Sequence, residues 1–167
     1  MIVGLAHSAV CVPDVDAAAR WYSEVLGLRV LSPPYRMEGD AIERDMSELV
    51  PSPVVVKAAI VGTGDEDRVI ELIEYPNVER TSPDTSMRDP SRPVSIVDPG
   101  LTHVGLVCDD LDATRGDLEE RGVKFLTNAN AEVAGLRTAW FEDPWGTVFI
   151  LLEKKDADRP YWRQFGS

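Results

Sequence analysis

The chain is poor in the residues on which many metal, redox and nucleic-acid proteins depend. Its 167 residues include two histidines, two cysteines and 17 lysines and arginines, against 29 aspartates and glutamates. The formal net charge of −12 argues against nucleic acid as a partner, because backbone phosphates are bound by clustered basic side chains. The same charge disfavours an anionic membrane surface, which attracts Lys and Arg.

Long hydrophobic runs and targeting signals are also lacking. No apolar run approaches the ~20 residues of a membrane-spanning helix, and the first residues show no basic segment ahead of a hydrophobic one. We therefore expect a cytoplasmic protein. Cys11 and Cys108 form no CxxC pair, so we expect two buried strand thiols rather than a disulfide or a catalytic thiol.

What the sequence does contain is one pattern that occurs twice. Each copy runs through Gly-Leu, one further residue, a histidine, a short apolar segment, an acidic residue, a helical pattern and a glycine. His103 follows His7 by 96 residues, and Asp110 follows Asp14 by the same interval. The only two histidines of the chain thus occupy equivalent positions in two modules rather than in a longer repeat array.

Each copy predicts a strand, a helix with an aspartate at its start, and three further strands. The first copy has strand patterns at 5–12, 28–31, 53–62 and 67–75. The second copy has them at 100–108, 123–126, 135–143 and 147–154. The sequence therefore predicts an α+β fold of two pseudo-symmetric βαβββ modules, at 1–75 and 101–154.

Three segments fall outside this symmetry. Residues 33–53 predict a long loop inside the first module. Residues 76–100 contain five prolines and predict a polar, extended linker between the modules. The tail at 155–167 contains three aromatic residues, which we expect to dock on the protein or on a second subunit.

Strand alternation predicts where the chemically active side chains point. Val10 and Val12 suit the sheet face that the helix covers, so His7 points to the other face. The same reasoning places His103 on the face away from its own helix. Glu71 lies within an apolar strand, where a carboxylate is costly to bury unless it is paired or coordinated.

Ordinary structural roles are the alternative for these residues. A single strand histidine is usually a hydrogen-bonded core residue, and Glu71 is within reach of a pairing with Arg68 or Arg137. Two histidines at equivalent places of a repeat, with no others in the chain, favour a shared role as ligands.

This repeat resembles the vicinal oxygen chelate superfamily, which includes glyoxalase I, methylmalonyl-CoA epimerase, extradiol dioxygenases and the fosfomycin and bleomycin resistance proteins. The likeness is carried by four segments: His7 with PDVDAAARWYSEVLGLRV, IELIEYP, LTHVGLVCDDLDA and FEDPWGTVFILLE. It implies paired modules that form an incomplete barrel around a metal and substrate pocket. It also implies one divalent metal ion, a small-molecule substrate and, in many members, a homodimer.

Carried over residue by residue, the resemblance implies His7, Glu71 and His103 as metal ligands. The fourth ligand of the family, an acid in its DPxG…ELxE ending, corresponds to Ile150 here. Glu153 follows three residues later and points to the other strand face. Two imidazoles and one carboxylate suit Fe²⁺, with Mn²⁺, Ni²⁺, Co²⁺ and Zn²⁺ as alternatives.

This ligand set predicts a metal-dependent enzyme that chelates two oxygens of a small organic substrate. We place dioxygenase-type chemistry first, because three protein ligands leave positions open. A glyoxalase- or epimerase-like lyase or isomerase is the first alternative, and a metal-free drug-binding protein is the second. The isomerase would need a base that the sequence does not identify, with candidates in the loop at Glu38, Glu43 and Glu48. Candidate substrate contacts are Tyr35, Met37, Trp140 and Ile150.

Overall fold

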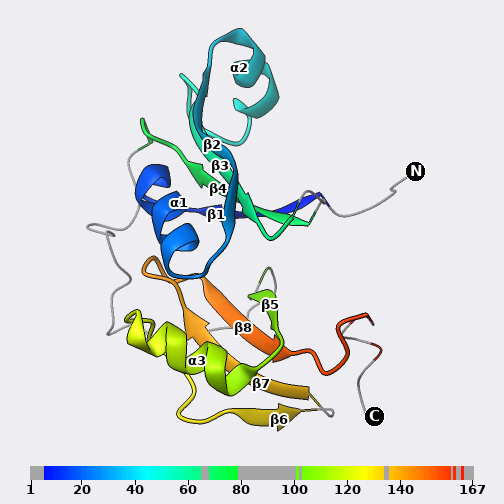
Figure 1. Ribbon diagram of the computed structural model, residues 1–167. Coiled ribbons are helices and arrows are strands. Elements are labelled where there is room, and N and C mark those ends of the chain that lie inside the picture. The colour runs from blue at the N-terminus through cyan, green and yellow to red at the C-terminus, as the bar shows by residue number, and fades with distance from the viewer. Residues whose placement is uncertain are drawn as a thin grey trace. The chain divides into compact units, whose positions relative to one another are not determined.

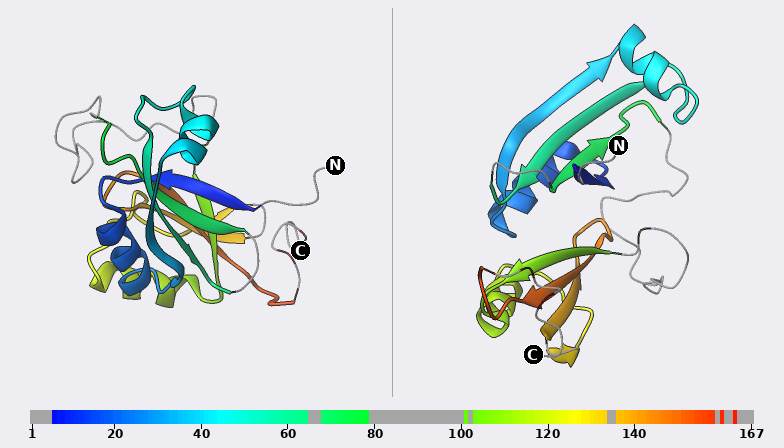
Figure 2. Two further views of the ribbon diagram at one scale, coloured as in Figure 1. Left: turned by 90° about the horizontal axis from the view of Figure 1, so that it is seen from above. Right: turned by 90° about the vertical axis from the view of Figure 1, so that its right-hand side faces the viewer.

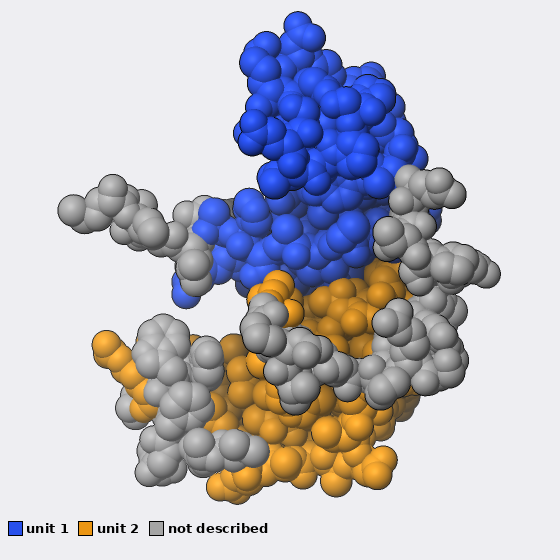
Figure 3. All heavy atoms as spheres, turned by 180° about the vertical axis from the view of Figure 1, so that it is seen from behind, with its two compact units in different colours: residues 1–85 blue, residues 86–167 orange. Residues whose placement is uncertain are grey.

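The structure, a computed structural model, describes residues 6–64, 68–78, 101, 103–133, 136–158, 160 and 163. The chain divides into two units, residues 1–85 and 86–167 (Figure 3). The boundary falls inside the predicted linker, of which 79–100 lie outside the described residues. The aromatic residues of the tail lie outside them as well.

Unit 1 contains a four-stranded sheet and two helices (Figure 1). Its elements are β1 (His7–Cys11), α1 (Val15–Glu24), β2 (Arg29–Glu38), α2 (Asp40–Met46), β3 (Val55–Gly62) and β4 (Val69–Glu74). The strand order is β1-β4-β3-β2, with β1 parallel to β4 and the other pairs antiparallel.

Unit 2 repeats this topology with one helix. Its elements are β5 (Val104–Cys108), α3 (Leu111–Glu120), β6 (Ala131–Val133), β7 (Leu136–Glu142) and β8 (Val148–Glu153). The strand order is β5-β8-β7-β6. Figure 2 shows α1 and α3 each packed along one face of its own sheet. The predicted α+β class and the two βαβββ modules are confirmed.

The predicted loop at 33–53 is wrong over most of its length. The strand predicted at 28–31 continues to Glu38, and α2 follows it. Two prolines are tolerated because they fall where β2, an edge strand, shifts register between Ser32 and Tyr35, so neither has a paired residue on β3. The start of β3 is consequently covered on both faces, which explains its nearly unbroken apolar sequence.

The strand predicted at 123–126 is also wrong. The second strand of unit 2 forms at 131–133 instead, and Phe125 makes an isolated bridge to Phe141. Arg115 of α3 holds the intervening segment in an irregular path. Its guanidinium lies 4.5 Å from the centre of the Phe125 ring and donates to the Thr127 carbonyl oxygen at 2.8 Å.

Both long helices begin in the same way. The Asp14 carboxylate accepts a hydrogen bond from the Ala17 N–H, and the Asp110 carboxylate accepts one from the Ala113 N–H, each at 2.9 Å. These bonds satisfy N–H groups that have no partner within the helix. The predicted helix starts are confirmed in both modules.

A second carboxylate contacts each helix, and it comes from the strand that is last in the sequence of its unit. Glu74 of β4 accepts from the Val15 N–H at 2.9 Å, and Glu153 of β8 accepts from the Leu111 N–H at 2.9 Å. Val15 and Leu111 are the first residues of α1 and α3. A negative charge at this position is favourable because the helix N-terminus carries partial positive charge.

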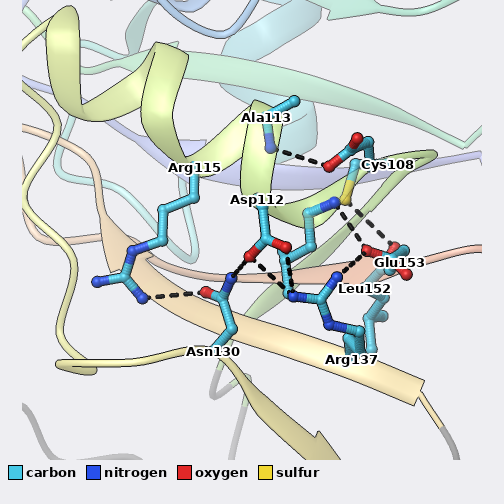
Figure 4. Close-up of polar contacts among 10 residues, drawn as sticks. Cys108, Asp112, Ala113, Arg115, Asn130, Arg137, Leu152 and Glu153 are labelled. Carbon is cyan, nitrogen blue, oxygen red and sulfur yellow. Dashed lines mark hydrogen bonds and ion pairs between the residues drawn. The ribbon is translucent and has the colours of Figure 1, made fainter.

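A polar network fastens α3 to its sheet (Figure 4). Arg137 of β7 donates to both carboxylate oxygens of Asp112 at 2.8 Å and to Glu153 at 2.9 Å. Asn130 donates to Asp112 at 2.7 Å and accepts from Arg115 at 3.0 Å. The network thus joins α3, β7, β8 and the segment before β6.

Removal of either cap should destabilise the fold to a similar extent. We expect Asp14→Ala and Asp110→Ala each to lower the free energy of unfolding by about 1 kcal/mol, because a helix N–H loses its acceptor. Urea unfolding followed by circular dichroism measures this. Asp109→Ala is the matched control, since Asp109 is exposed and outside the cap, and it should cost less than about 0.5 kcal/mol. Equal stability of the Asp109 and Asp110 variants would contradict the assignment.

Acid should weaken the Asp112 contacts. Hydrogen bonds from Arg137 and then Asn130 hold the pKa of Asp112 below its ordinary value. Because this pKa is lower in the folded than in the unfolded state, the contacts stabilise the fold above about pH 4 and are lost as the pH falls through the lowered value. The stability difference between wild type and Asp112→Asn should therefore be constant from pH 7 to 5 and shrink below about pH 4. A difference that persists to pH 2 would show that the ion pair is not its source.

Candidate functional site

The sheet face opposite α1, called here the site face of unit 1, carries the predicted ligands of this unit. Lys57 and Glu74 mark the other face, because Lys57 pairs with Asp16 of α1 and Glu74 bonds the start of that helix. Since side chains alternate along a strand, Glu71 must point away from α1. His7 lies on the same side, and it contacts Glu71.

The contact between His7 and Glu71 joins β1 and β4. The His7 Nε2 atom lies 3.3 Å from the Glu71 Oε2 atom, and the two side chains are 47% and 18% exposed. Parallel pairing sets this proximity, since Ala9 is opposite Glu71 and His7 is two residues earlier. Arg137, considered above as a partner for Glu71, forms ion pairs with Asp112 and Glu153.

The spacing of the two donor atoms fits one divalent cation. Imidazole nitrogen and carboxylate oxygen bind such ions at about 2.0–2.2 Å. Two ligands at that distance, separated by about 90–110° at the ion, lie about 3.0–3.5 Å from each other. The 3.3 Å separation of His7 and Glu71 falls in this range without rearrangement of either side chain.

Unit 2 places its histidine against an aromatic ring. His103 contacts the edge of Trp140 of β7, with ring centroids 4.9 Å apart and an interplanar angle of 73°. Trp140 is paired with the buried Ile150 of β8, which in turn is opposite Gly105 of β5. These residues lie on the site face of unit 2, defined as the sheet face opposite α3.

The two sheets can be aligned through their helix contacts. Glu74 and Glu153 make the same hydrogen bond to the first residue of a helix, so they occupy equivalent positions. Three residues earlier, Glu71 in β4 corresponds to Ile150 in β8. The structure therefore has an apolar side chain in unit 2 where unit 1 has a carboxylate, and Glu153 is turned toward α3.

Sequence reasoning did not single out Glu142, the last residue of β7. It is half-buried and opposite Val148, and its strand parity with Trp140 places it on the site face of unit 2. Asp143 holds the turn that follows, because its carboxylate accepts from the N–H groups of Trp145 at 2.9 Å and Thr147 at 2.7 Å. The sequence could have indicated it, because Glu142 lies two residues after Trp140 in the same predicted strand and therefore on the same sheet face.

The three acids considered as bases in the loop differ in their surroundings. Glu38 pairs with Arg36, and Glu48 is exposed after the end of α2. Glu43 of α2 accepts from the Ser52 hydroxyl and from the Val54 N–H, and these bonds lower its pKa. The Glu43 carboxylate therefore anchors α2 to the start of β3.

The predicted substrate contacts fall in two separate places. Tyr35 and Met37 of β2 are opposite Ala58 and Val56 on the site face of unit 1. Tyr35 is exposed, whereas Met37 packs against an apolar cluster under α2. Trp140 and Ile150 form the cross-strand pair beside His103 described above.

The prediction of two buried thiols is wrong for Cys11. Cys11 is exposed and Cys108 is half-buried, and neither forms a disulfide. Cys11 ends β1 on the site face, which α1 does not cover, whereas burial raises the pKa of Cys108 on the helix side.

Within the described part of the chain, no three or more His, Cys, Asp or Glu side chains come together in a group that could hold a metal ion. No described helix is long and apolar enough to cross a membrane. His7 and Glu71 belong to one unit and His103 to the other.

Comparison with known proteins gives a match along nearly the whole chain. The family model for the Glyoxalase/Bleomycin resistance protein/Dioxygenase superfamily matches residues 4–151. A 2-epi-5-epi-valiolone epimerase from Actinomyces sp. is 28% identical over 171 residues, covering 97% of this chain and 85% of that protein.

Two solved structures share the fold. A glyoxalase family protein from Bacillus cereus has a TM-score of 0.72 at 18% identity, covering 92% of this chain and 95% of that one. TnmS3, an antibiotic binding protein from Streptomyces sp., has a TM-score of 0.55 at 23% identity, covering 92% and 98%.

Proposed function

Because the chain belongs to the Glyoxalase/Bleomycin resistance protein/Dioxygenase superfamily, we propose that it is a metal-dependent enzyme acting on a small organic substrate with two vicinal oxygens. Members of this superfamily commonly bind a divalent metal ion, and they include enzymes and small-molecule binders. The observation that carries the proposal is the 3.3 Å contact between His7 and Glu71 on the face opposite α1.

In this proposal His7, Glu71 and His103 hold the metal ion. When bound, the ion supplies Lewis-acid chemistry: it fixes two substrate oxygens and stabilises negative charge that develops on them. Glu71 supplies the only anionic ligand, and Trp140 positions the His103 ring through its edge contact. Ile150 has no donor atom, so unit 2 would supply only His103 as a ligand.

We place proton transfer of the epimerase or isomerase type first among the reactions. The 28% identical relative that covers 97% of the chain is an epimerase. Such chemistry needs a base to take the proton from the carbon beside the chelated oxygens. Glu142 is a carboxylate on the site face of unit 2, at the end of the strand that also carries Trp140. We assign the role of base to Glu142.

Two other functions have support of their own. Dioxygenase-type chemistry, with Fe²⁺ as the metal, is favoured by the three-ligand set that Ile150 leaves. Metal-free binding of a drug-like molecule is favoured by the fold shared with the antibiotic binding protein TnmS3. Cytoplasmic location and a homodimer remain predictions.

Metal binding should depend on each of the three ligands. We expect wild-type protein, reconstituted anaerobically with Fe²⁺, Mn²⁺, Ni²⁺, Co²⁺ or Zn²⁺, to retain about one ion of at least one of them. His7→Ala, Glu71→Gln and His103→Ala should each weaken binding by more than about 100-fold, beyond the loss seen when only a group supporting a ligand is removed. Equilibrium dialysis with elemental analysis measures this.

Glu74→Gln is the matched control for Glu71→Gln, because both residues lie on β4 but point to opposite faces. It should leave metal affinity unchanged. The metalloenzyme proposal fails if wild-type protein binds none of the five ions, or if the Glu71 and Glu74 variants bind equally well.

The role of Glu142 can be tested separately from metal binding. With 2-hydroxycyclohexanone, which has two vicinal oxygens and an exchangeable C–H, the metal-loaded enzyme should incorporate deuterium from D₂O. Glu142→Gln should slow this exchange by about 10²- to 10⁴-fold, the range of general-base contributions, while metal content stays the same.

The alternatives give different results in the same preparation. Oxygen uptake with catechol, without deuterium exchange, would establish the dioxygenase reading instead. Ligand affinity that survives His7→Ala and His103→Ala, with neither reaction, would establish a binding protein.

A further inference from the structure

We propose that the substrate carries an uncharged apolar group, which lies along β4 toward α2, next to the oxygens held at His7 and Glu71. The inference rests on the proposed function and adds the substrate class. It is carried by the apolar surface that adjoins Glu71 and by the placement of charge around it.

An apolar cluster begins beside the candidate metal ligands. Its buried centre consists of Val56 and Ala58 of β3 and of Val54, the residue just before that strand. The partly buried side chains packed on this centre are Met37, Ile42, Met46, Val50, Ile73 and Tyr75. Ile42 and Met46 come from α2, which lies beyond β2 and β3 in Figure 1. We call this set the α2 cluster.

The α2 cluster is continuous with Glu71. Ile73 and Tyr75 follow Glu71 by two and four residues, so all three point to the same face. Residues two apart on a strand are separated by about 6.6 Å, so Ile73 is the next side chain after Glu71 on this face. Ile60 is directly opposite Glu71 on β3, and Ala9 is directly opposite it on β1.

This surface remains partly accessible beside the ligands. Ile60, Ile73 and Tyr75 are half-buried, whereas Ala9 is exposed. Burial raises the pKa of Tyr75, with smaller effects of Cys11 and Glu71, so its phenol is neutral at neutral pH. A group that lay here would bury apolar surface beside the carboxylate of Glu71.

The other charged side chains of β3 and β4 for which a contact is given point to the helix side. Lys57 is directed to Asp16 of α1, and Glu74 to the start of that helix. Among the described residues of β1, β3 and β4, none on the site face is a lysine or arginine. Arg29 of β2 is opposite Gly62, four residues along β3 from Ala58, or about 13 Å. The charges that the described contacts place next to the α2 cluster are therefore negative: Glu71 on the site face, and Glu43 of α2, whose carboxylate accepts from the Val54 N–H at 2.7 Å. Both disfavour an anionic group there.

The test uses three hydroxamates that offer the same pair of chelating oxygens. Acetohydroxamate has a methyl group, benzohydroxamate has a phenyl ring, and 4-carboxybenzohydroxamate adds an anion to that ring. We expect the metal-loaded full chain to bind benzohydroxamate at least about 10-fold tighter than acetohydroxamate, because the ring buries more apolar surface. The added carboxylate should abolish this gain. Titration calorimetry measures the three affinities.

Ile42→Lys puts a cation into the α2 cluster and should reverse the preference in favour of the carboxylated probe. Ala41→Lys adds the same charge to an exposed position of the same helix and should leave the preference intact. Equal affinities for the three hydroxamates in wild type, or equal behaviour of the two lysine variants, would overturn the inference.

A metal-independent measurement separates this inference from the proposed function. N-phenyl-1-naphthylamine and 1-anilinonaphthalene-8-sulfonate share one apolar skeleton and differ by a sulfonate. The neutral dye should bind the metal-free chain at least about 10-fold tighter, and Ile42→Lys but not Ala41→Lys should remove that difference. Loss of all metal binding with this dye pattern intact would overturn only the metalloenzyme proposal. Identical dye affinities in the two variants would overturn the apolar surface itself.

Discussion

In each module the first N–H of the helix donates a hydrogen bond to a carboxylate on the last strand in sequence, and this bond fixes which side chains of that strand face the helix. Glu74 receives the Val15 N–H and Glu153 receives the Leu111 N–H, so each strand has one carboxylate committed to the helix side. Because side chains alternate, a residue three positions earlier must point to the opposite face. Glu71 is turned away from α1 by this constraint, and His7 meets it there.

The same constraint separates structural charge from candidate functional charge. Ion pairs such as Arg137 with Asp112 gather where a helix can supply the partner. These ion pairs stabilise the packing of the helix on its sheet. The sheet face away from the helix is largely apolar. A histidine and a carboxylate that remain on such a face are conspicuous, because neither is needed to hold a helix in place.

Much of this was predictable from the sequence, because the repeat and the alternation of strands are both local. They place His7 and Glu71 on one face and Asp14 at a helix start. The rest depended on contacts between distant residues. The short helix α2 depends on the packing of Ile42 and Met46 against the start of β3. The strand β6 forms later in the sequence than predicted, because Arg115 holds the segment before it in an irregular conformation. The pairing of β7 with β8 was needed to place Glu142 opposite Val148, next to the Trp140–Ile150 pair.

The two copies of the repeat have diverged in what they can contribute. Unit 1 keeps a histidine and a carboxylate in contact and adds the α2 cluster. Unit 2 replaces that carboxylate by Ile150 and packs its histidine against Trp140. Ile150 has no donor atom, so in the proposed site Glu71 would be the one carboxylate among the ligands. Glu142 lies on the same sheet face of unit 2 as Ile150, which is why the proposal gives the role of base to that carboxylate.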